Sequence, residues 1–368
     1  MEIVVSPALL ASAMAVAGSV VKGRNSGVSG HALLAEPVND GLFITGSCAP
    51  TSLVCMVECE CRGSLGKTLL PLKRLPAILR EVKAEQITIS ATKGKLVIKA
   101  DGSKFTLAID DPEEFPDTVG GAMTGAWELD AAVLKRLVSR TVFSVDTEST
   151  RYALGGICLV WDSGKLLAVS TDTRRLSVAS AAVAELAPLP ETCPSNILVP
   201  AAALRAFTMA LDDEATVRIS VGERQVMFAS GGTTLVTLMY EGRFPRWRDV
   251  IPQRSSVKMT IDAGAMASAL RQAQIVISEE SRGVTARVSG GEMSFSSGSS
   301  DIGDADIRFS VGQTDDEVVF TVDPKYVLDY LATIELGVPV ELEYTDEDTA
   351  IVFKDGDSST YVVMPLAR

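Results

Sequence analysis

The chain has 368 residues, a length that suits two or three domains, each able to bury a core of its own. Its composition is that of a globular protein, with 46% hydrophobic, 22% charged and only 5% aromatic residues. The net charge of −13, from 34 basic and 47 acidic side chains, excludes a general attraction to nucleic acid. Any contact with phosphates must therefore come from local clusters of Lys and Arg.

The first predicted elements are a strand over residues 1–5 and a helix that begins with Ser6 as its N-cap. Residues 8–21 are apolar enough to resemble the core of a signal peptide, but Glu2 stands where such a peptide carries a basic residue. No window of the sequence is long and apolar enough to span a bilayer. We therefore expect a cytoplasmic protein without a membrane partner.

Four of the six cysteines follow within residues 48–61, on a run that is predicted to be a strand. The run has no Cys-x-x-Cys pair, and His31 is the only imidazole in the chain, so the usual form of a zinc site is missing. We favour buried thiols in a reducing compartment, and we expect neither a metal nor a cofactor.

A strand that reaches a proline and is followed by a helical segment occurs three times in the chain. The prolines are Pro71, Pro200 and Pro324, which are 129 and 124 residues apart (200−71 and 324−200). A unit of about 125 residues therefore recurs. First helices are expected at residues 6–20, 130–143 and 262–277, with Asp130 and Asp262 as N-caps, and second helices at 72–83, 201–211 and 325–335.

Residues that alternate between apolar and polar close each unit and predict antiparallel strand pairs. The pairs are 86–90 with 96–99, 216–221 with 225–228, and 340–344 with 351–353. The fold class is therefore α+β, with three similar domains that each pack two helices on antiparallel sheet. Phe-Pro pairs mark the exits of the first two units, and we place the domains at residues 1–122, 123–253 and 254–368.

The predicted helices are more basic than the chain as a whole. Lys73 and Arg74 belong to the second helix of the first unit, and Lys135, Arg136 and Arg140 to the first helix of the second. Acidic residues gather instead in strands and turns. This segregation favours a basic face that holds a phosphate backbone without reading bases.

The motifs Glu241-Gly242-Arg243-Phe244-Pro245, Thr171-Asp172 with Arg175-Leu176, and Tyr361-Val362-Val363-Met364-Pro365 resemble the bacterial β sliding clamp family, the processivity factors of DNA polymerase III. The resemblance implies a non-catalytic, head-to-tail homodimer whose six domains form a ring around double-stranded DNA, independent of base sequence. Such a ring tethers the replicative polymerase, and its contacts with DNA can be weak because topology holds the duplex. The basic residues implied to face DNA are Arg24, Lys73, Arg74, Lys135, Arg136 and Arg140.

The resemblance also implies a pocket between domains two and three that binds short linear motifs. Its partners would be the DNA polymerase III alpha subunit, the clamp loader, other polymerases and repair proteins. Carried over by motif, its walls would be Arg151, Leu154, Thr171, Arg174, Leu176, Pro245, Val250, Tyr326, Ile351, Val362, Met364, Pro365 and Leu366. An apolar cleft with an adaptable Met suits a hydrophobic motif.

The chain departs from the family pattern at several of these positions. Thr173 and Arg174 stand where the family usually has Gly and His, Asp249 replaces a residue that is often basic, and Ala201-Ala202 replace a usual Arg-Lys. These departures leave open a specialised second clamp that serves repair or accessory polymerases. A scaffold that binds peptides but not DNA is the other alternative.

An enzyme is less consistent with the sequence. Gly63-Ser64-Leu65-Gly66-Lys67-Thr68 resembles a phosphate loop, but the required first glycine is replaced by Cys61. Any His-dependent triad would have to use His31, whose neighbours predict the start of a strand. No spacing singles out a pair of carboxylates for acid–base work. We expect no catalytic residues.

Overall fold

A computed structural model describes residues 2–21, 27–38, 41–62, 66–92, 94–117, 124–148, 152–182, 196–278, 282–312, 317–335 and 337–366. The chain divides into two compact units, and every strand pairing described within them is antiparallel. The first unit comprises Met1–Lys135, Leu186–Pro194 and Val199–Met239, and the second Arg136–Glu185, Ser195–Leu198 and Tyr240–Arg368.

The first unit contains two sheets. The five-stranded sheet has the order β5-β1-β7-β8-β9, with β1 (Glu2–Val5), β5 (Glu60–Arg62), β7 (Ile87–Thr92), β8 (Lys95–Ala100) and β9 (Ser103–Ala108). The eight-stranded sheet has the order β10-β15-β16-β17-β4-β3-β2-β6, with β2 (Ala32–Val38), β3 (Gly41–Cys48), β4 (Thr51–Glu58), β6 (Thr68–Pro71), β10 (Thr124–Asp130), β15 (Thr216–Val221), β16 (Gln225–Ser230) and β17 (Thr233–Leu238). Its helices are α1 (Pro7–Gly18), α2 (Leu75–Glu81) and α4 (Ala201–Thr208), with 3₁₀ turns η1 (Val28–Gly30) and η2 (Pro112–Glu114).

The second unit also contains two sheets. The eight-stranded sheet has the order β14-β11-β12-β13-β25-β24-β23-β18, with β11 (Gly156–Asp162), β12 (Lys165–Thr171), β13 (Arg175–Ala182), β14 (Asn196–Pro200), β18 (Val257–Asp262), β23 (Pro339–Tyr344), β24 (Ile351–Asp355) and β25 (Ser359–Val363). The four-stranded sheet has the order β21-β20-β19-β22, with β19 (Val284–Ser289), β20 (Glu292–Ser299), β21 (Gly303–Ser310) and β22 (Val318–Val322). Helices α5 (Ala263–Ala273) and α6 (Pro324–Leu331) belong to this unit, as do η3 (Val142–Ser144), η4 (Tyr152–Gly155), η5 (Trp247–Val250) and η6 (Gln274–Val276). Helix α3 (Ala131–Ser139) begins in the first unit and ends in the second, and β14 begins in the second unit and ends in the first.

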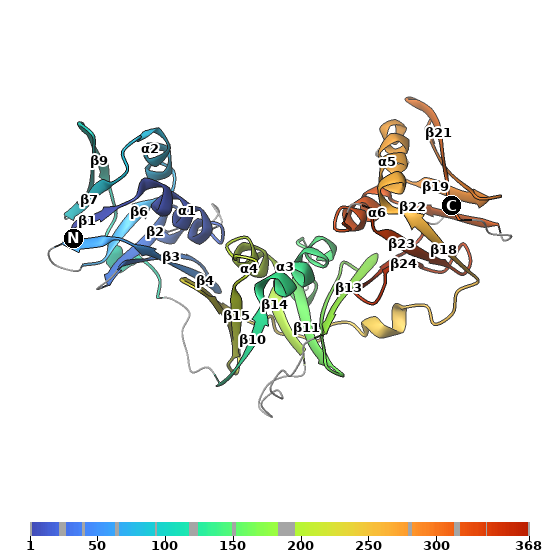
Figure 1. Cartoon of the computed structure of the whole chain (residues 1–368), viewed down its shortest axis with the longest axis horizontal. Coiled ribbons are helices and arrows are strands. Elements are labelled where there is room, and N and C mark those ends of the chain that lie inside the picture. The colour runs from blue at the N-terminus through green and yellow to red at the C-terminus, as the bar shows by residue number, and fades with distance from the viewer. Residues whose placement is uncertain are drawn as a thin grey trace. The chain divides into compact units, whose positions relative to one another are not determined.

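Helices lie in pairs over the cores of both units (Figure 1). Helix α1 contacts α2 in the first unit, and α5 contacts α6 in the second. The core of the first unit brings Leu10 and Met14 of α1 against Ile89 and Ile98 of the five-stranded sheet. An apolar stripe along each helix therefore buries itself against sheet, as the sequence periodicity predicts.

The helices begin and end for local reasons. The Asp262 carboxylate accepts a hydrogen bond of 2.6 Å from the Ala265 amide, which confirms that residue as an N-cap. The side chain of Ser6 makes no such bond. Helix α2 starts later than predicted because Pro76 has no amide hydrogen and is tolerated only in the first turn of a helix.

The three predicted strand pairs are confirmed as β7–β8, β15–β16 and β23–β24.

Both eight-stranded sheets continue from one predicted repeat into the next. Strand β17 pairs with β4, with Leu235 opposite Leu53, and β13 pairs with β25, with Leu176 opposite Val362. The predicted boundary at residue 122 lies outside the described residues. The repeats along the sequence are thus joined by main-chain hydrogen bonds within each compact unit.

Candidate functional site

A turn between β12 and β13 forms one wall of a hollow in the second unit. The Asp172 carboxylate accepts hydrogen bonds from the amides of Arg174 and Arg175, at 2.9 and 3.0 Å. The Thr171 hydroxyl donates to the Arg175 carbonyl at 2.6 Å and accepts from the Thr173 amide at 3.1 Å. These bonds hold Thr173 at a φ of 78°, a left-handed conformation that is strained for a β-branched residue.

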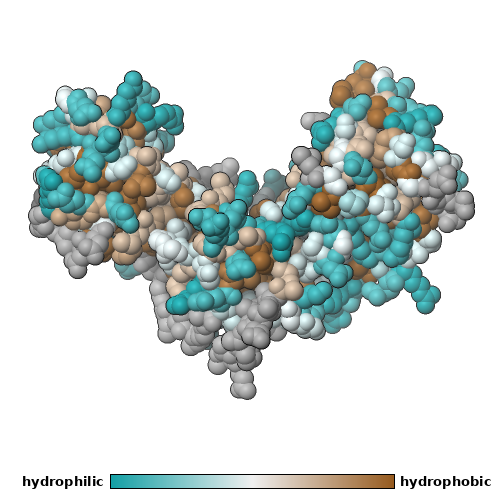
Figure 2. Space-filling view, viewed as in Figure 1, coloured by the Kyte–Doolittle hydropathy of each residue, from teal (hydrophilic) through white to brown (hydrophobic). Residues whose placement is uncertain are grey.

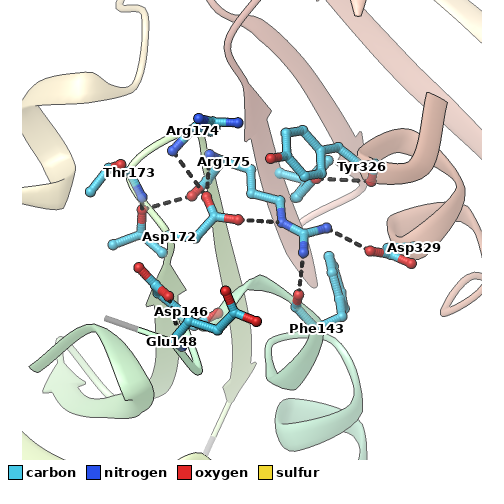
Figure 3. Close-up of polar contacts among 12 residues, drawn as sticks. Phe143, Asp146, Glu148, Asp172, Thr173, Arg174, Arg175, Tyr326 and Asp329 are labelled. Carbon is cyan, nitrogen blue, oxygen red and sulfur yellow. Dashed lines mark hydrogen bonds and ion pairs between the residues drawn. The ribbon is translucent and has the colours of Figure 1, made fainter. Parts of the chain in front are cut away.

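Arg175 lies at the centre of this site and contacts residues far apart in the sequence (Figure 3). Its guanidinium donates to Asp172 at 2.9 Å, to Asp329 of α6 at 2.7 Å, and to the Phe143 carbonyl at 2.6 Å. It also stacks on the ring of Tyr326, 4.5 Å from the ring centroid. Since the side chain of Arg175 is only 8% exposed, these charges are paired largely out of water.

The last described residues complete the hollow. Strand β25 places Val362 opposite Leu176, and the Met364 amide donates to the Arg174 carbonyl at 2.9 Å. The hollow has a volume of about 210 Å³, and Met364 on its wall is 45% exposed. Its lining residues are Thr171, Thr173, Arg174, Arg175, Leu176, Pro245, Trp247, Val250, Val362 and Met364.

A second hollow, of about 440 Å³, lies on the other side of Met364. Pro365 and Leu366 line it, together with Phe320, Thr321, Glu347 and Asp348. The Leu366 amide donates to the Thr321 carbonyl of β22 at 2.7 Å. Main-chain hydrogen bonds therefore hold the short segment 364–366 at its first and last residues, and Met364 lines both hollows.

The predicted pocket residues are distributed unevenly. Seven of them line the first hollow, namely Thr171, Arg174, Leu176, Pro245, Val250, Val362 and Met364. Leu154 and Ile351 are buried and line neither hollow, and Tyr326 stacks on Arg175. Arg151 lies outside the described residues. The predicted set of pocket residues omitted Thr173, Arg175 and Trp247, which also line the hollow. Trp247 could have been predicted because it lies two residues after Pro245 in the same motif.

The basic residues predicted to face DNA differ in their exposure and in their ion pairs. Lys73, Arg74 and Arg136 are exposed, whereas Lys135 donates to Asp213 at 2.6 Å. Arg140 is only 5% exposed and pairs with Asp355 at 2.5 Å and with the Ser359 hydroxyl at 3.0 Å. Its burial argues against a contact with phosphate, because that contact would have to break a desolvated ion pair. Arg24 lies outside the described residues.

The residues that resembled catalytic groups have other contacts. Lys67 of the loop that resembles a phosphate loop pairs with Glu36 at 2.9 Å, and residues 63–65 lie outside the described part. His31 is exposed and bonds Asp110 at 2.8 Å. Among the described residues, no group of three or more His, Cys, Asp or Glu is placed to hold a metal ion. No helix in the described part of the chain is long and apolar enough to cross a membrane.

Comparisons with known proteins cover the whole chain. Models of the DNA polymerase III beta subunit match in order: the N-terminal domain at residues 1–119, the central domain at 128–246 and the C-terminal domain at 248–367. The beta sliding clamp of Pseudomonas putida is 27% identical over 363 residues, 98% of this chain and 97% of its own. That of Chlamydia muridarum is 26% identical over 335 residues, 91% of this chain and 90% of its own.

Solved structures agree with this fold. The DNA polymerase III subunit beta from Pseudomonas aeruginosa superposes with a TM-score of 0.89 at 24% identity, with 100% of both chains covered. The beta subunit from Thermotoga maritima also gives a TM-score of 0.89, at 18% identity, with 100% of this chain and 99% of its own covered.

Proposed function

Because the chain belongs to the DNA polymerase III beta subunit family, a family of sliding clamps, we propose that it encircles duplex DNA as a homodimeric ring and tethers the replicative polymerase. The observation that carries the proposal is the ordered match of all three domain models, which together account for nearly the whole chain. The chain's role is then to hold DNA and partners and not to catalyse. Its location would be the cytoplasm.

Ring closure requires two different surfaces that fit each other in a head-to-tail contact. Strand β9 is the edge of the five-stranded sheet, and β21 is the edge of the four-stranded sheet. The exposed side chains at β9 include Lys104, which is opposite Lys99 of β8. Strand β21 exposes Asp304, together with Asp306 and Arg308, which pair with each other. An unpaired edge can add a strand from a second copy, and Asp304 on β21 complements the lysines beside β9.

Exposed apolar residues next to β21 support the same contact. Ile275 of η6 is 73% exposed and Ile302, just before β21, is 55% exposed. Figure 2 shows hydrophobic surface over the end of α5 and β21. On β9, Phe105 and Leu107 are half-buried on the inward face. Charge reversal at one edge is expected to convert the dimer to monomer in sedimentation, and reversal at both edges to restore it; a wild-type monomer at micromolar concentration would contradict ring closure.

The first hollow is proposed to bind the linear motifs of the polymerase alpha subunit, the clamp loader and repair proteins. Its walls are mainly apolar and include Leu176, Val362 and Met364, and Arg174 adds an exposed positive charge. A concave apolar surface with few polar groups suits a short hydrophobic segment. Met364 suits several such segments because its unbranched side chain can change rotamer.

The DNA-facing surface is proposed to include Lys73, Arg74 and Arg136, because these side chains are exposed and carry no ion pair among the described residues. Phosphate contacts of this kind hold any base sequence and allow sliding. Arg24 and Lys135 remain in the proposed set, and Arg140 is removed from it because it is buried.

The deciding experiment measures retention of the intact dimer on nicked circular DNA after loading by a clamp loader. A ring stays on the circle and leaves when the circle is cut, whereas a peptide-binding scaffold responds to neither step. Reversal of Lys73, Arg74 and Arg136 to Glu is expected to reduce loading and processive synthesis. The control reverses three exposed basic residues on strands, Lys165, Arg218 and Arg287, and changes the net charge equally. Equal loss in both variants would contradict the assignment of the face.

A further inference from the structure

Two thiols lie close together where the chain passes between the two sheets of the first unit. Strand β4 of the eight-stranded sheet ends at Glu58, and β5 of the five-stranded sheet begins at Glu60, so Cys59 alone connects them. Its sulfur lies 3.6 Å from that of Cys61. Both cysteines are half-buried against the core of the unit.

The alternation of β5 places the two cysteines on one face. On the other face, the Arg62 guanidinium donates to both oxygens of the Glu60 carboxylate, at 3.0 and 2.9 Å. Residues two apart in a regular strand are about 7 Å apart, near the upper limit of the Cα separation in a disulfide. Here the two sulfurs already lie 3.6 Å apart.

The surroundings hold the pair in place. Cys61 is opposite Ile3 in the register of β5 with β1, and its thiol donates to the Gly41 carbonyl at 3.4 Å. A side chain at position 41 would come within 2.6 Å of the Val57 carbonyl, so a glycine is required where β3 meets β4 beside this corner. The position of Cys61 is therefore fixed by its strand register and by a hydrogen bond to a neighbouring strand.

We propose that Cys59 and Cys61 form an oxidation site that closes an intrachain disulfide on exposure to a hydroperoxide and reopens with a thiol reductant. Cys61 first gives up the thiol proton that bonds Gly41. Its thiolate then attacks the peroxide and breaks the O–O bond, which gives a sulfenic acid and hydroxide from hydrogen peroxide. The Cys59 sulfur then attacks the sulfenic sulfur, the S–S bond forms, and the Cys59 proton leaves with the hydroxyl group as water. The two thiols are oxidised by two electrons and the peroxide is reduced by two.

The environment of Cys59 suits it to be the second thiol to react. Burial, with the neighbouring Cys61 as a further cause, raises the pKa of Cys59 to about 12, so this thiol stays protonated near neutral pH. We assign the first attack to Cys61, an order that the single variants test. Elsewhere in the described chain, Cys55 and Cys158 are 4% and 1% exposed, which shields them from a dissolved oxidant.

The disulfide would fix the corner between the two sheets, and it would remove the thiol proton that now bonds Gly41. The test treats the full-length dimer with hydrogen peroxide, alkylates the remaining thiols and identifies the peptide that contains residues 59–61 by mass spectrometry. The expected peptide is unalkylated at both positions, lighter than the dithiol by the mass of two hydrogen atoms, and restored by dithiothreitol.

Single variants provide the control. Cys59→Ser is expected to leave Cys61 as a sulfenic acid that a dimedone probe captures, and Cys61→Ser to leave Cys59 largely unoxidised. Both substitutions are small and keep a polar hydrogen, and circular dichroism would check the fold. The proposal is overturned if both thiols remain alkylatable in the wild type after peroxide treatment that oxidises Cys48, or if either cysteine is found only in disulfides between chains.

Discussion

Replacing Arg175 with Ala should destabilise the second unit more than any other single truncation at the site. The substitution removes charge-assisted hydrogen bonds to Asp172, Asp329 and the Phe143 carbonyl, and leaves two carboxylates without their cation. Removing one partner of a buried pair costs about 3–5 kcal/mol. The Asp329 side chain is 32% exposed, so water takes over part of its solvation, and we expect about 3 kcal/mol, the lower end of that range.

Urea unfolding measures this loss. Trp161 and Trp247 lie in the second unit and Trp127 in the first, so fluorescence of a variant without Trp127 reports mainly on the second. With a slope of about 3 kcal/mol per molar urea, the midpoint should fall by roughly 1 M. Hydrogen exchange would locate the loss in residues around β13 and α6.

The matched control is Arg174→Ala. Arg174 is the neighbouring residue and has the same side chain, but it is exposed and lines the hollow. This variant should keep the wild-type midpoint while it weakens peptide binding. If both variants unfold at the same urea concentration, the buried network around Arg175 does not stabilise the unit and the reasoning is wrong.

Three further predictions follow from the same unit. Thr173→Gly should stabilise it by about 1 kcal/mol, seen as a higher urea midpoint, because glycine adopts a φ of 78° without strain. Met364→Ala should weaken binding of a hydrophobic motif peptide about tenfold in calorimetry; Met209→Ala, an equally flexible side chain that is 75% exposed outside the hollow, should leave it unchanged. Burial raises the pKa of Glu343, but hydrogen bonds from Lys258 and Lys354 outweigh it and the pKa is lowered. The ionised carboxylate thus contributes stability that is present above its unfolded pKa of about 4.5 and is lost as pH falls through the folded value. The wild type should exceed Glu343→Gln in stability at neutral pH, and a gap that persists at pH 2 would contradict this assignment.

Local patterns in the sequence predicted much of the fold. Three hairpins and the N-cap at Asp262 follow from period-two alternation and from a side chain that bonds its own helix. Motif resemblance placed Met364 and Val362 on the wall of the hollow. These features depend on neighbours within a few residues, or on a motif that can be read directly.

The features that were missed depend on partners far away in the sequence. Arg140 on a helix was expected to be exposed, but its partner Asp355 lies 215 residues further along and buries it. Arg175 belonged to a recognised motif, but its bond to Asp329 spans 154 residues and gives no local signal. The same reason explains why the pairing of β17 with β4 was not predicted.

The pairing of β17 with β4 has a consequence for how the chain can be divided into stable fragments. The sequence repeats in modules of about 125 residues, but each compact unit of the structure contains strands from two successive repeats. A fragment cut at residue 122 would leave β4 and β17 with unpaired main-chain amide and carbonyl groups, and such strand edges pair with other chains. Fragments should therefore be cut at the borders of the two compact units. Fragments that contain a single repeat are expected to aggregate.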